Sequence, residues 1–287
     1  NLQTATRALH RDGLVVIEDI ITHTTLSHLN TCMVSDALIL QSAGDSSPYN
    51  YNLGNIQQDP PLTRPFFSPT LFLNPLARQI IHSVLGPRSR LSFISANSAM
   101  PPTPTSPPQS QPVHSDADFA HPASPFALVL NIPLVDMTPA NGSTEVWLGT
   151  HSLSSLSAQE GAHGERASGR IAPALLEERR AERAPSQPVV KRGSIVLRDL
   201  RLWHAGKPNR TQDVRVMLAL IHFAAWFRNP MRVEFDEDLR EVLESAGGDL
   251  QVQSVFVPRA ELEERYMKRG FGNSHDFNQE DRLEEIF

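Results

Sequence analysis

From Val113 onward the chain is a series of short apolar segments separated by turn formers, and this punctuation limits the fold more than any other feature. The segments are residues 126–134, 143–147, 188–190, 193–197 and 214–227. The turn formers between them are His121-Pro122, Pro139–Gly142, Lys191–Gly193 and Lys207–Asn209. Short strands with such punctuation predict a sandwich or a barrel. We expect a mainly β fold with flanking helices and a jelly-roll core of the cupin type.

The flanking regions show helical patterns. Apolar spacing and end signals predict helices over residues 2–11, 24–40, 76–85, 174–183, 237–245 and 259–268. Strands are expected at 14–17 and 91–95, and a surface loop at 43–69. We therefore expect one domain over residues 1–287. It has a helical N-terminal part (about 1–90), a jelly-roll core (about 91–230) and a helical C-terminal tail (about 231–287).

Composition excludes several kinds of partner. The net charge is −6, which argues against a general nucleic-acid surface. The sequence has no run of about 18 apolar residues, so we expect no membrane span. Cys32 is the only cysteine, which excludes an internal disulfide and a thiolate cluster and favours a reducing, cytoplasmic location. The C-terminal helices either cover the domain or form a homodimer, and both arrangements stay open.

The first chemical signal is His114-Ser115-Asp116, at the start of an extended segment. In an extended chain, residues i and i+2 point to the same face, so His114 and Asp116 can bind one ion. A second triplet, His10-Arg11-Asp12, ends a predicted helix, where i and i+2 point about 200° apart. We do not expect that triplet to bind a metal.

His204 and Arg215 complete the pattern. Two imidazoles and one carboxylate suit a facial triad that binds Fe(II) and leaves coordination positions open. Arg215 begins a strand in which no acidic residue is available as a partner through residue 227. A buried cation needs an anion, and arginine binds a planar carboxylate through two donors. We expect Arg215 to hold a dicarboxylate co-substrate; the alternative is a surface ion pair with Asp213.

Longer segments resemble the phytanoyl-CoA dioxygenase family, in particular its fungal branch that acts on small molecules and natural products. The segments that carry the resemblance are residues 11–17, 111–116, 134–152, 193–199 and 203–215. The third contains an Asn141-Gly142 turn and ends in Gly149-Thr150-His151, where the family more often has Pro-Gly-Ser-His. The segments occur in the family's order and spacing, and together they span most of the chain.

The resemblance implies a double-stranded β-helix fold, with Fe(II), 2-oxoglutarate and O2. By position, His114, Asp116 and His204 would bind the iron and form the catalytic centre. Arg215 would bind the distal carboxylate of 2-oxoglutarate. Many members have a hydroxyl residue where this chain has Gly206, so one co-substrate hydrogen bond would come from elsewhere.

Further residues are candidates for binding 2-oxoglutarate or substrate. Asn131 lies mid-strand between apolar residues, so a satisfied core amide is its alternative. Gln111 and Thr144 are similar candidates, with ordinary surface hydrogen bonding as the alternative. Aromatic candidates for an apolar substrate pocket are Phe66, Phe67 and Phe119. The segments 49–52 and 100–112 are candidate lids.

These features predict an Fe(II)- and 2-oxoglutarate-dependent dioxygenase that oxidises a C–H bond of a small organic molecule, a secondary metabolite. Hydroxylation is the default outcome, with desaturation and rearrangement as variants, and succinate and CO2 are released. Two alternatives stay open. A non-oxidative metal-binding jelly roll, such as an isomerase or binding module, would have no use for Arg215. A zinc hydrolase would need a general base, for which Glu145 is the candidate.

Overall fold

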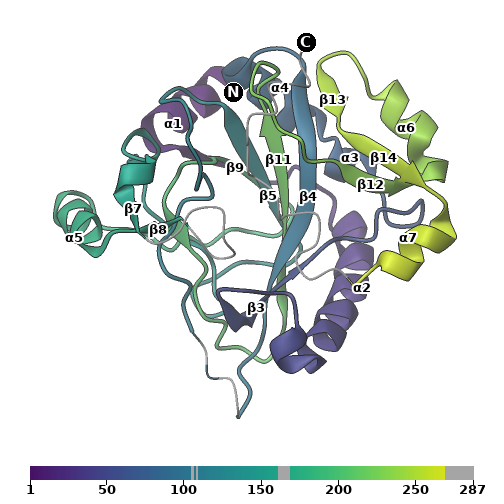
Figure 1. The fold of residues 1–287 in the computed structure, drawn as a ribbon, viewed down its shortest axis with the longest axis horizontal. Helices are drawn as coiled ribbons and strands as arrows, with labels where there is room; N and C mark the ends of the chain where they lie inside the picture. The colour runs from purple at the N-terminus through teal and green to yellow at the C-terminus, as the bar shows by residue number, and fades with distance from the viewer. Residues whose placement is uncertain (105–106, 108, 161–168, 269–287) are drawn as a thin grey trace.

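The computed structural model describes residues 1–104, 107, 109–160 and 169–268, and its centre is a large β-sheet flanked by helices (Figure 1). Within these residues the main sheet has eight strands. In spatial order they are β1 (Leu14–Ile17), β9 (Ile195–Asp199), β5 (Ala127–Pro133), β11 (Arg215–Phe223), β4 (Ser89–Ala99), β3 (Asn52–Gln58) and β2 (Tyr49–Asn50), with β13 (Leu250–Val252) also beside β4. All neighbours are antiparallel except β13 and β4.

A smaller sheet carries the histidine pair. Its strands are β6 (Glu145–Val146), β7 (Gln159–Glu160), β8 (Arg170–Ile171) and β10 (His204–Ala205). β10 pairs with β6, and β7 pairs with β8. Single-residue bridges from His114 to His204 and to Arg170 join the two pairs. A separate parallel pair is formed by β12 (Val233–Asp236) and β14 (Ser254–Val257).

Helices lie around both the main sheet and the smaller sheet (Figure 1). They are α1 (Leu2–Asp12), α2 (His23–Ser42), α3 (Pro69–Phe72), α4 (Pro75–Leu85), α5 (Pro173–Glu182), α6 (Arg240–Ser245) and α7 (Arg259–Arg265). Single 3-10 turns are η1 (Gly44–Ser46), η2 (Thr150–Ser152), η3 (Leu156–Ala158) and η4 (Glu237–Leu239). No helix in the described part of the chain is long and apolar enough to cross a membrane.

Local sequence signals set the first helix and its exit into the sheet. The Asn1 side chain accepts a hydrogen bond from the Thr4 amide and caps α1. Gly13 ends the helix in the left-handed conformation, with φ 74°, which glycine adopts without a Cβ penalty. The Gly13 carbonyl then accepts from the Asp199 amide at 2.8 Å. This turn places β1 beside β9, with which it pairs.

Alternation along β11 separates the two faces of the main sheet. Val216, Leu218 and Leu220 belong to the largest apolar cluster, which includes residues of α2. The other face of β11 carries Arg215, Met217 and Ala219, since side chains in a strand alternate. One face thus forms the core with the helices, and the other, called the inner face below, carries Arg215.

The expected jelly-roll core holds, but two flanking assignments are wrong. The loop expected at 43–69 contains β2 and β3, and the N-terminal part also supplies β1, so it is not purely helical. The tail expected to be helical contains β12, β13 and β14 besides its helices. β3 is polar, and it becomes a strand because it pairs with β4. The expected strand at 188–190 is reduced to one bridge between Val190 and Met137.

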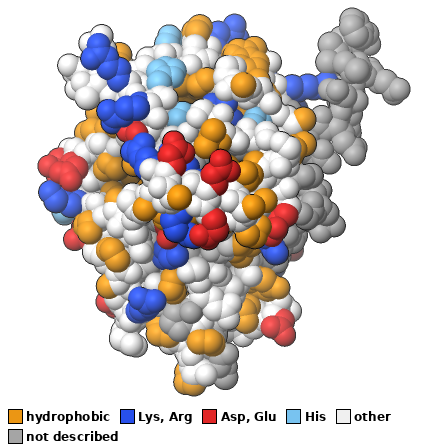
Figure 2. All heavy atoms as spheres, turned by 90° about the vertical axis from the view of Figure 1, so that its left-hand side faces the viewer, with side chains coloured by type: hydrophobic (Ala, Val, Ile, Leu, Met, Phe, Trp, Pro, Cys, Tyr) orange, Lys and Arg blue, Asp and Glu red, His pale blue; other side chains and the backbone are white. Residues whose placement is uncertain are grey.

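Charged side chains are mixed on the face seen in Figure 2, which is the side of α5 in Figure 1. Basic and acidic groups lie next to each other there rather than in a field of one sign. This distribution is unlike the basic stripe that tracks a nucleic-acid backbone. Residues 105, 106 and 108 of the Pro-rich candidate lid lie outside the described residues.

Candidate metal centre

His114, Asp116 and His204 converge on one point. Their ligand atoms all lie within 4.8 Å of one another. Asp116 Oδ1 is 3.6 Å from Nε2 of His114 and 3.6 Å from Nε2 of His204. The intervening Ser115 side chain points away and donates to the Arg201 carbonyl. The structure thus brings together the three residues expected from the sequence: His114 and Asp116 lie on one extended segment, where i and i+2 share a face, and His204 lies on β10.

Both imidazoles are oriented by the same local device. Nδ1 of His114 lies 2.9 Å from the Pro112 carbonyl, and Nδ1 of His204 lies 3.0 Å from the Leu202 carbonyl. A carbonyl can only accept, so Nδ1 carries the hydrogen in each ring. Nε2 is then the unprotonated nitrogen and faces the common point. Backbone partners of this kind fix the tautomer of metal-binding histidines.

The electrostatics keep all three groups in the form that binds a cation. Burial lowers the pKa of His114 and lowers that of His204 further. Burial alone would raise the pKa of Asp116, but its neighbours outweigh this effect, chiefly through the charge of Arg198, so this pKa lies below its usual value. Neutral imidazoles and an ionised carboxylate are therefore present at neutral pH. This donor set fits Fe(II).

Arg198 is a member of the site that our sequence interpretation missed. It comes from β9, is 7% exposed, and its Nη2 donates to Oδ2 of Asp116. The signal in the sequence was a lone arginine in the apolar strand 195–199. That signal does not say which neighbour the arginine meets, because its partner Asp116 lies 82 residues earlier in the chain.

Arg215 is a buried cation on the inner face, as expected. It is 1% exposed and donates to the carbonyls of Gly142, at 2.7 Å, and Asn97, at 3.4 Å. Among the described residues no carboxylate lies within ion-pair distance of it, so the alternative of a surface pair with Asp213 is wrong. Nε is buried without a partner in the same set. Burial lowers the pKa of Arg215 to about 10, so it stays charged at neutral pH.

Inner-face residues around Arg215 are not fully covered. Asn97, Met217 and Ala219 stay partly exposed, although they lie in the middle of the main sheet. Residues at such positions are usually buried when a barrel interior is filled. The inner face near Arg215 is therefore partly open to solvent.

Gln111 explains why this chain has Gly206. Its side-chain Oε1 accepts from the Gly206 backbone amide at 2.7 Å, and the backbone amide of Gln111 donates to the Gly206 carbonyl at 2.8 Å. A Cβ at position 206 would lie 2.5 Å from Oε1, so a larger residue would displace this bond. The Gln111 side-chain amide also reaches the Asn50 carbonyl, at 3.4 Å. Both ends of Gln111 thus contact backbone, which favours a structural role over co-substrate binding.

Asn131 and Thr144 occupy different settings. Asn131 is 4% exposed; its amide donates to the Leu218 carbonyl and its oxygen accepts from Arg198 Nε, both at 3.2 Å. It therefore contacts the same guanidinium that donates to Asp116. Thr144 is half-buried, one residue before β6. Their assignment to co-substrate binding remains a prediction.

Tyr51 forms one wall of the site. It sits between β2 and β3 with φ 66°, a left-handed conformation that is uncommon outside glycine. Its ring centroid is 4.8 Å from that of His114, and the Arg170 guanidinium lies 6.0 Å from the ring. Strained residues of this kind cluster at functional sites.

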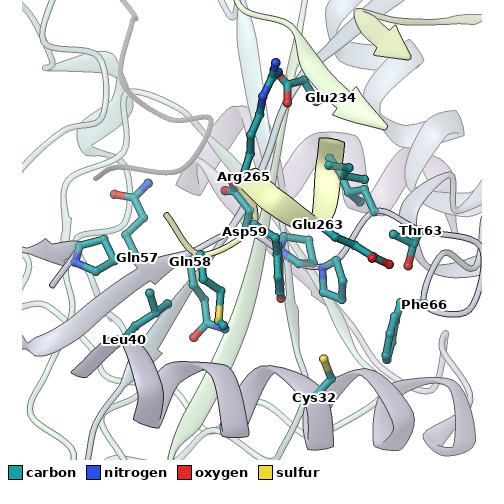
Figure 3. Close-up of a pocket in the computed structure, with 17 residues that line it drawn as sticks. Cys32, Leu40, Gln57, Gln58, Asp59, Thr63, Phe66, Glu234, Glu263 and Arg265 are labelled. Carbon is teal, nitrogen blue, oxygen red and sulfur yellow. The ribbon is translucent and has the colours of Figure 1, made fainter. Parts of the chain in front are cut away.

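A separate pocket of about 210 Å³ lies between α2 and α7. Figure 3 shows Cys32 of α2 below it and Arg265 of α7 above it. Its lining includes Phe66, but neither the metal ligands nor Arg215. It lies on the α2 side of the main sheet, since Gln58 in its lining donates to the Met33 carbonyl. Phe67 instead stacks on Phe72 in the core.

Comparisons with known proteins agree with this geometry. The sequence model of the phytanoyl-CoA dioxygenase (PhyH) family matches residues 9–217. The epimerase SnoN, solved with Fe3+, alpha ketoglutarate and nogalamycin RO, is 16% identical, with a TM-score of 0.59 over 78% of this chain and 84% of that one. The carbocyclase SnoK from nogalamycin biosynthesis is 16% identical, with 0.56 over 78% and 84%. Apo EctD from S. alaskensis is 20% identical, with 0.53 over 76% and 75%. At these identities the likeness shows the fold, and it confirms the jelly roll.

Proposed function

This chain belongs to the phytanoyl-CoA dioxygenase family, and from that premise we propose that it is an Fe(II)- and 2-oxoglutarate-dependent oxygenase acting on a C–H bond of a small organic molecule. One observation carries the proposal. A His-Asp-His triad and a buried arginine without a carboxylate partner in the described residues occur in the same small jelly roll. A metal site alone would serve many functions. The arginine adds a place for the far end of a dicarboxylate.

Each residue has a role that follows from its contacts. His114 and His204 offer Nε2, and Asp116 offers Oδ1, to the metal. Arg215 keeps its charge and has Nε unused, so it binds the distal carboxylate of 2-oxoglutarate. With O2, the bound iron and 2-oxoglutarate supply an oxidant for C–H bonds, and succinate and CO2 leave. The protein orients the reactants and excludes water.

The reaction type depends on how the substrate is placed. Similar folds include an epimerase and a carbocyclase, so one architecture supports different outcomes. We propose hydroxylation as the default and a secondary metabolite as the substrate class; membership of the fungal branch stays a prediction. The main apolar cluster contains residues from Ala5 to Leu250, which supports a single catalytic domain. With Cys32 as the only thiol, we propose a cytoplasmic location.

The alternatives lose support. Glu145 is the candidate base of a zinc hydrolase, but it accepts from Trp147 Nε1 and pairs with Lys207. It also lies opposite Ala205, on the other face of the small sheet from His204. A non-oxidative metal-binding jelly roll has no use for the buried charge of Arg215, whose burial without an anion is costly.

An anaerobic visible spectrum tests the proposal. The metal-free protein is titrated with Fe(II) and then with 2-oxoglutarate, beside Arg215→Ala, His204→Ala and the exposed control Arg232→Ala. We expect a metal-to-ligand charge-transfer band in the wild type and the control. The band weakens in Arg215→Ala and is absent in His204→Ala. A wild type that binds metal without giving the band would favour the non-oxidative jelly roll.

A further inference from the structure

Asp116 divides its two oxygens between two tasks. Oδ1 is the atom at 3.6 Å from Nε2 of both histidines. Oδ2 accepts the hydrogen bond from Nη2 of Arg198. Arg198 is 7% exposed, so water does not compete effectively for this contact. The oxygen that accepts from Arg198, Oδ2, is therefore hindered from turning toward the metal position between the two histidines.

Arg198 is itself held in place across three adjacent strands. Its Nε donates to Asn131 Oδ1 on β5, and Asn131 Nδ2 donates to the Leu218 carbonyl on β11. Rotation of the guanidinium would break this chain of bonds. Arg198 Nη1 is buried with no partner in the part of the chain that the structure describes. A buried donor without a partner destabilises the folded state, so this arrangement calls for a reason other than stability.

The number of open coordination positions supplies that reason. An octahedral ion with three single-atom protein ligands keeps three positions open, which a chelating keto acid and O2 together fill. If both oxygens of Asp116 bound the ion, only two positions would stay open. The chelating 2-oxo acid would then need both of them and leave none for O2, and the narrow bite of a bidentate carboxylate would crowd these two positions.

We propose that Arg198 is a positioning residue that confines Asp116 to one metal-binding oxygen and so keeps enough coordination positions open for the 2-oxo acid and O2 together. The inference rests on the proposed function, which it deepens. Asn131 is the second member of this device, because it fixes the plane of the guanidinium. Neither residue is required to touch the co-substrate.

The test uses Co(II) as a spectroscopic probe in the full chain. Wild type, Arg198→Met, Arg198→Lys, Asn131→Ala and the control Arg232→Met are loaded with Co(II). The dissociation constant of Co(II), the visible d–d bands and the dissociation constant of 2-oxoglutarate are then measured. Circular dichroism checks that each variant is folded.

We expect Arg198→Met to retain Co(II), to show altered d–d bands, and to bind 2-oxoglutarate about 10- to 100-fold more weakly. Arg198→Lys restores one donor to Oδ2 and should recover most of the affinity. The affinity of Asn131→Ala for 2-oxoglutarate should lie between those of the wild type and Arg198→Met. If Arg198→Met does not fold, Asn131→Ala tests the role of Arg198 in its place. A purely structural role would lower thermal stability while leaving the bands and the 2-oxoglutarate affinity unchanged.

The outcomes separate the two ideas. Wild-type affinity for 2-oxoglutarate in folded, Co(II)-loaded Arg198→Met or Asn131→Ala overturns the role of Arg198 and leaves the oxygenase proposal standing. A wild-type protein that binds Co(II) but no 2-oxoglutarate overturns the oxygenase proposal, and this inference with it.

Discussion

The backbones of His114 and His204 are hydrogen-bonded to each other in both directions. The His114 amide donates to the His204 carbonyl at 2.9 Å, and the His204 amide donates to the His114 carbonyl at 3.0 Å. Directly opposed residues of an antiparallel pair place their side chains side by side, and the two rings lie 4.3 Å apart. The pairing of the chain therefore builds two thirds of the metal site, and Asp116 follows on the same segment.

Arg215→Lys should weaken 2-oxoglutarate binding without affecting the metal. Lysine keeps the charge but lacks the two-donor fork, and a lost charge-assisted hydrogen bond corresponds to roughly 10- to 100-fold in affinity. Calorimetric titration of the Co(II)-loaded protein with 2-oxoglutarate measures this change. Arg232→Lys, at an exposed position, should behave as wild type. Equal affinities in the two lysine variants would remove Arg215 from the co-substrate site.

Gly142→Ala should destabilise the protein and disturb Arg215. Gly142 has φ 79°, its carbonyl accepts from Arg215, and an added Cβ would collide with the Lys207 carbonyl. Gly44 has φ 58° with open space around it, so Gly44→Ala carries the backbone strain alone. We expect Gly142→Ala to lose about 2 kcal/mol more than Gly44→Ala in urea unfolding. Equal losses would show that the contact with Lys207 relaxes freely.

Tyr51→Gly should be more stable than Tyr51→Ala. Both variants lose the ring that packs on His114, but only alanine keeps the strained φ of 66°. Left-handed backbone costs a non-glycine residue roughly 1 kcal/mol, and urea midpoints at equal slope report this difference. If alanine were the more stable of the two, Tyr51 would not be strained. Both variants should also turn over 2-oxoglutarate with less substrate oxidised, as expected for a lost wall of the site.

His222 should make the protein sensitive to acid. It is 2% exposed, and neither ring nitrogen has a partner among the described residues. Burial, with a smaller effect from Arg78, lowers the pKa of His222 to about 3. Between that value and about 6.5 the unfolded chain binds a proton that the folded chain does not, so stability falls as the pH falls. From pH 7 to pH 5 the loss is about 2 kcal/mol.

His222→Leu removes this contribution, so its free energy of unfolding should fall less between pH 7 and pH 5 than that of the wild type. Urea unfolding at the two pH values measures the difference, which does not depend on the absolute stability of the variant. His82→Gln, at an exposed position, serves as the control and should keep the wild-type pH dependence. If the free energy of unfolding of His222→Leu fell between pH 7 and pH 5 as much as that of the wild type, other buried groups would dominate the loss of stability in acid.

The sequence was sufficient to predict site residues where a local pattern determines their geometry. His114 and Asp116 share a face because the chain there is extended, and Arg215 begins a strand without an acid, so both features follow from spacing. The resemblance to the family added the identity of the co-substrate. The family match confirms that resemblance over residues 9–217.

The sequence was insufficient to predict a contact when the two residues or strands that meet lie far apart in the chain. Arg198 meets Asp116, which lies 82 residues earlier and outside any strand of the main sheet, and no local pattern encodes that neighbour. β3 was missed for the same reason, since a polar segment becomes a strand only by pairing with β4. Asn131 illustrates the intermediate case. Its burial in a strand was expected, but its partner Arg198 was not.

The pairing of β1 with β9 has a consequence for biosynthesis. Leu14 pairs with Arg198, so β1 is synthesised long before the strand with which it pairs. Such non-local pairing slows folding and leaves a strand edge exposed in the nascent chain. His204 also follows β9 in the chain, so the three candidate metal ligands are all present only after residue 204 has been synthesised. A fragment released before that point would lack His204 and with it one of the three metal ligands.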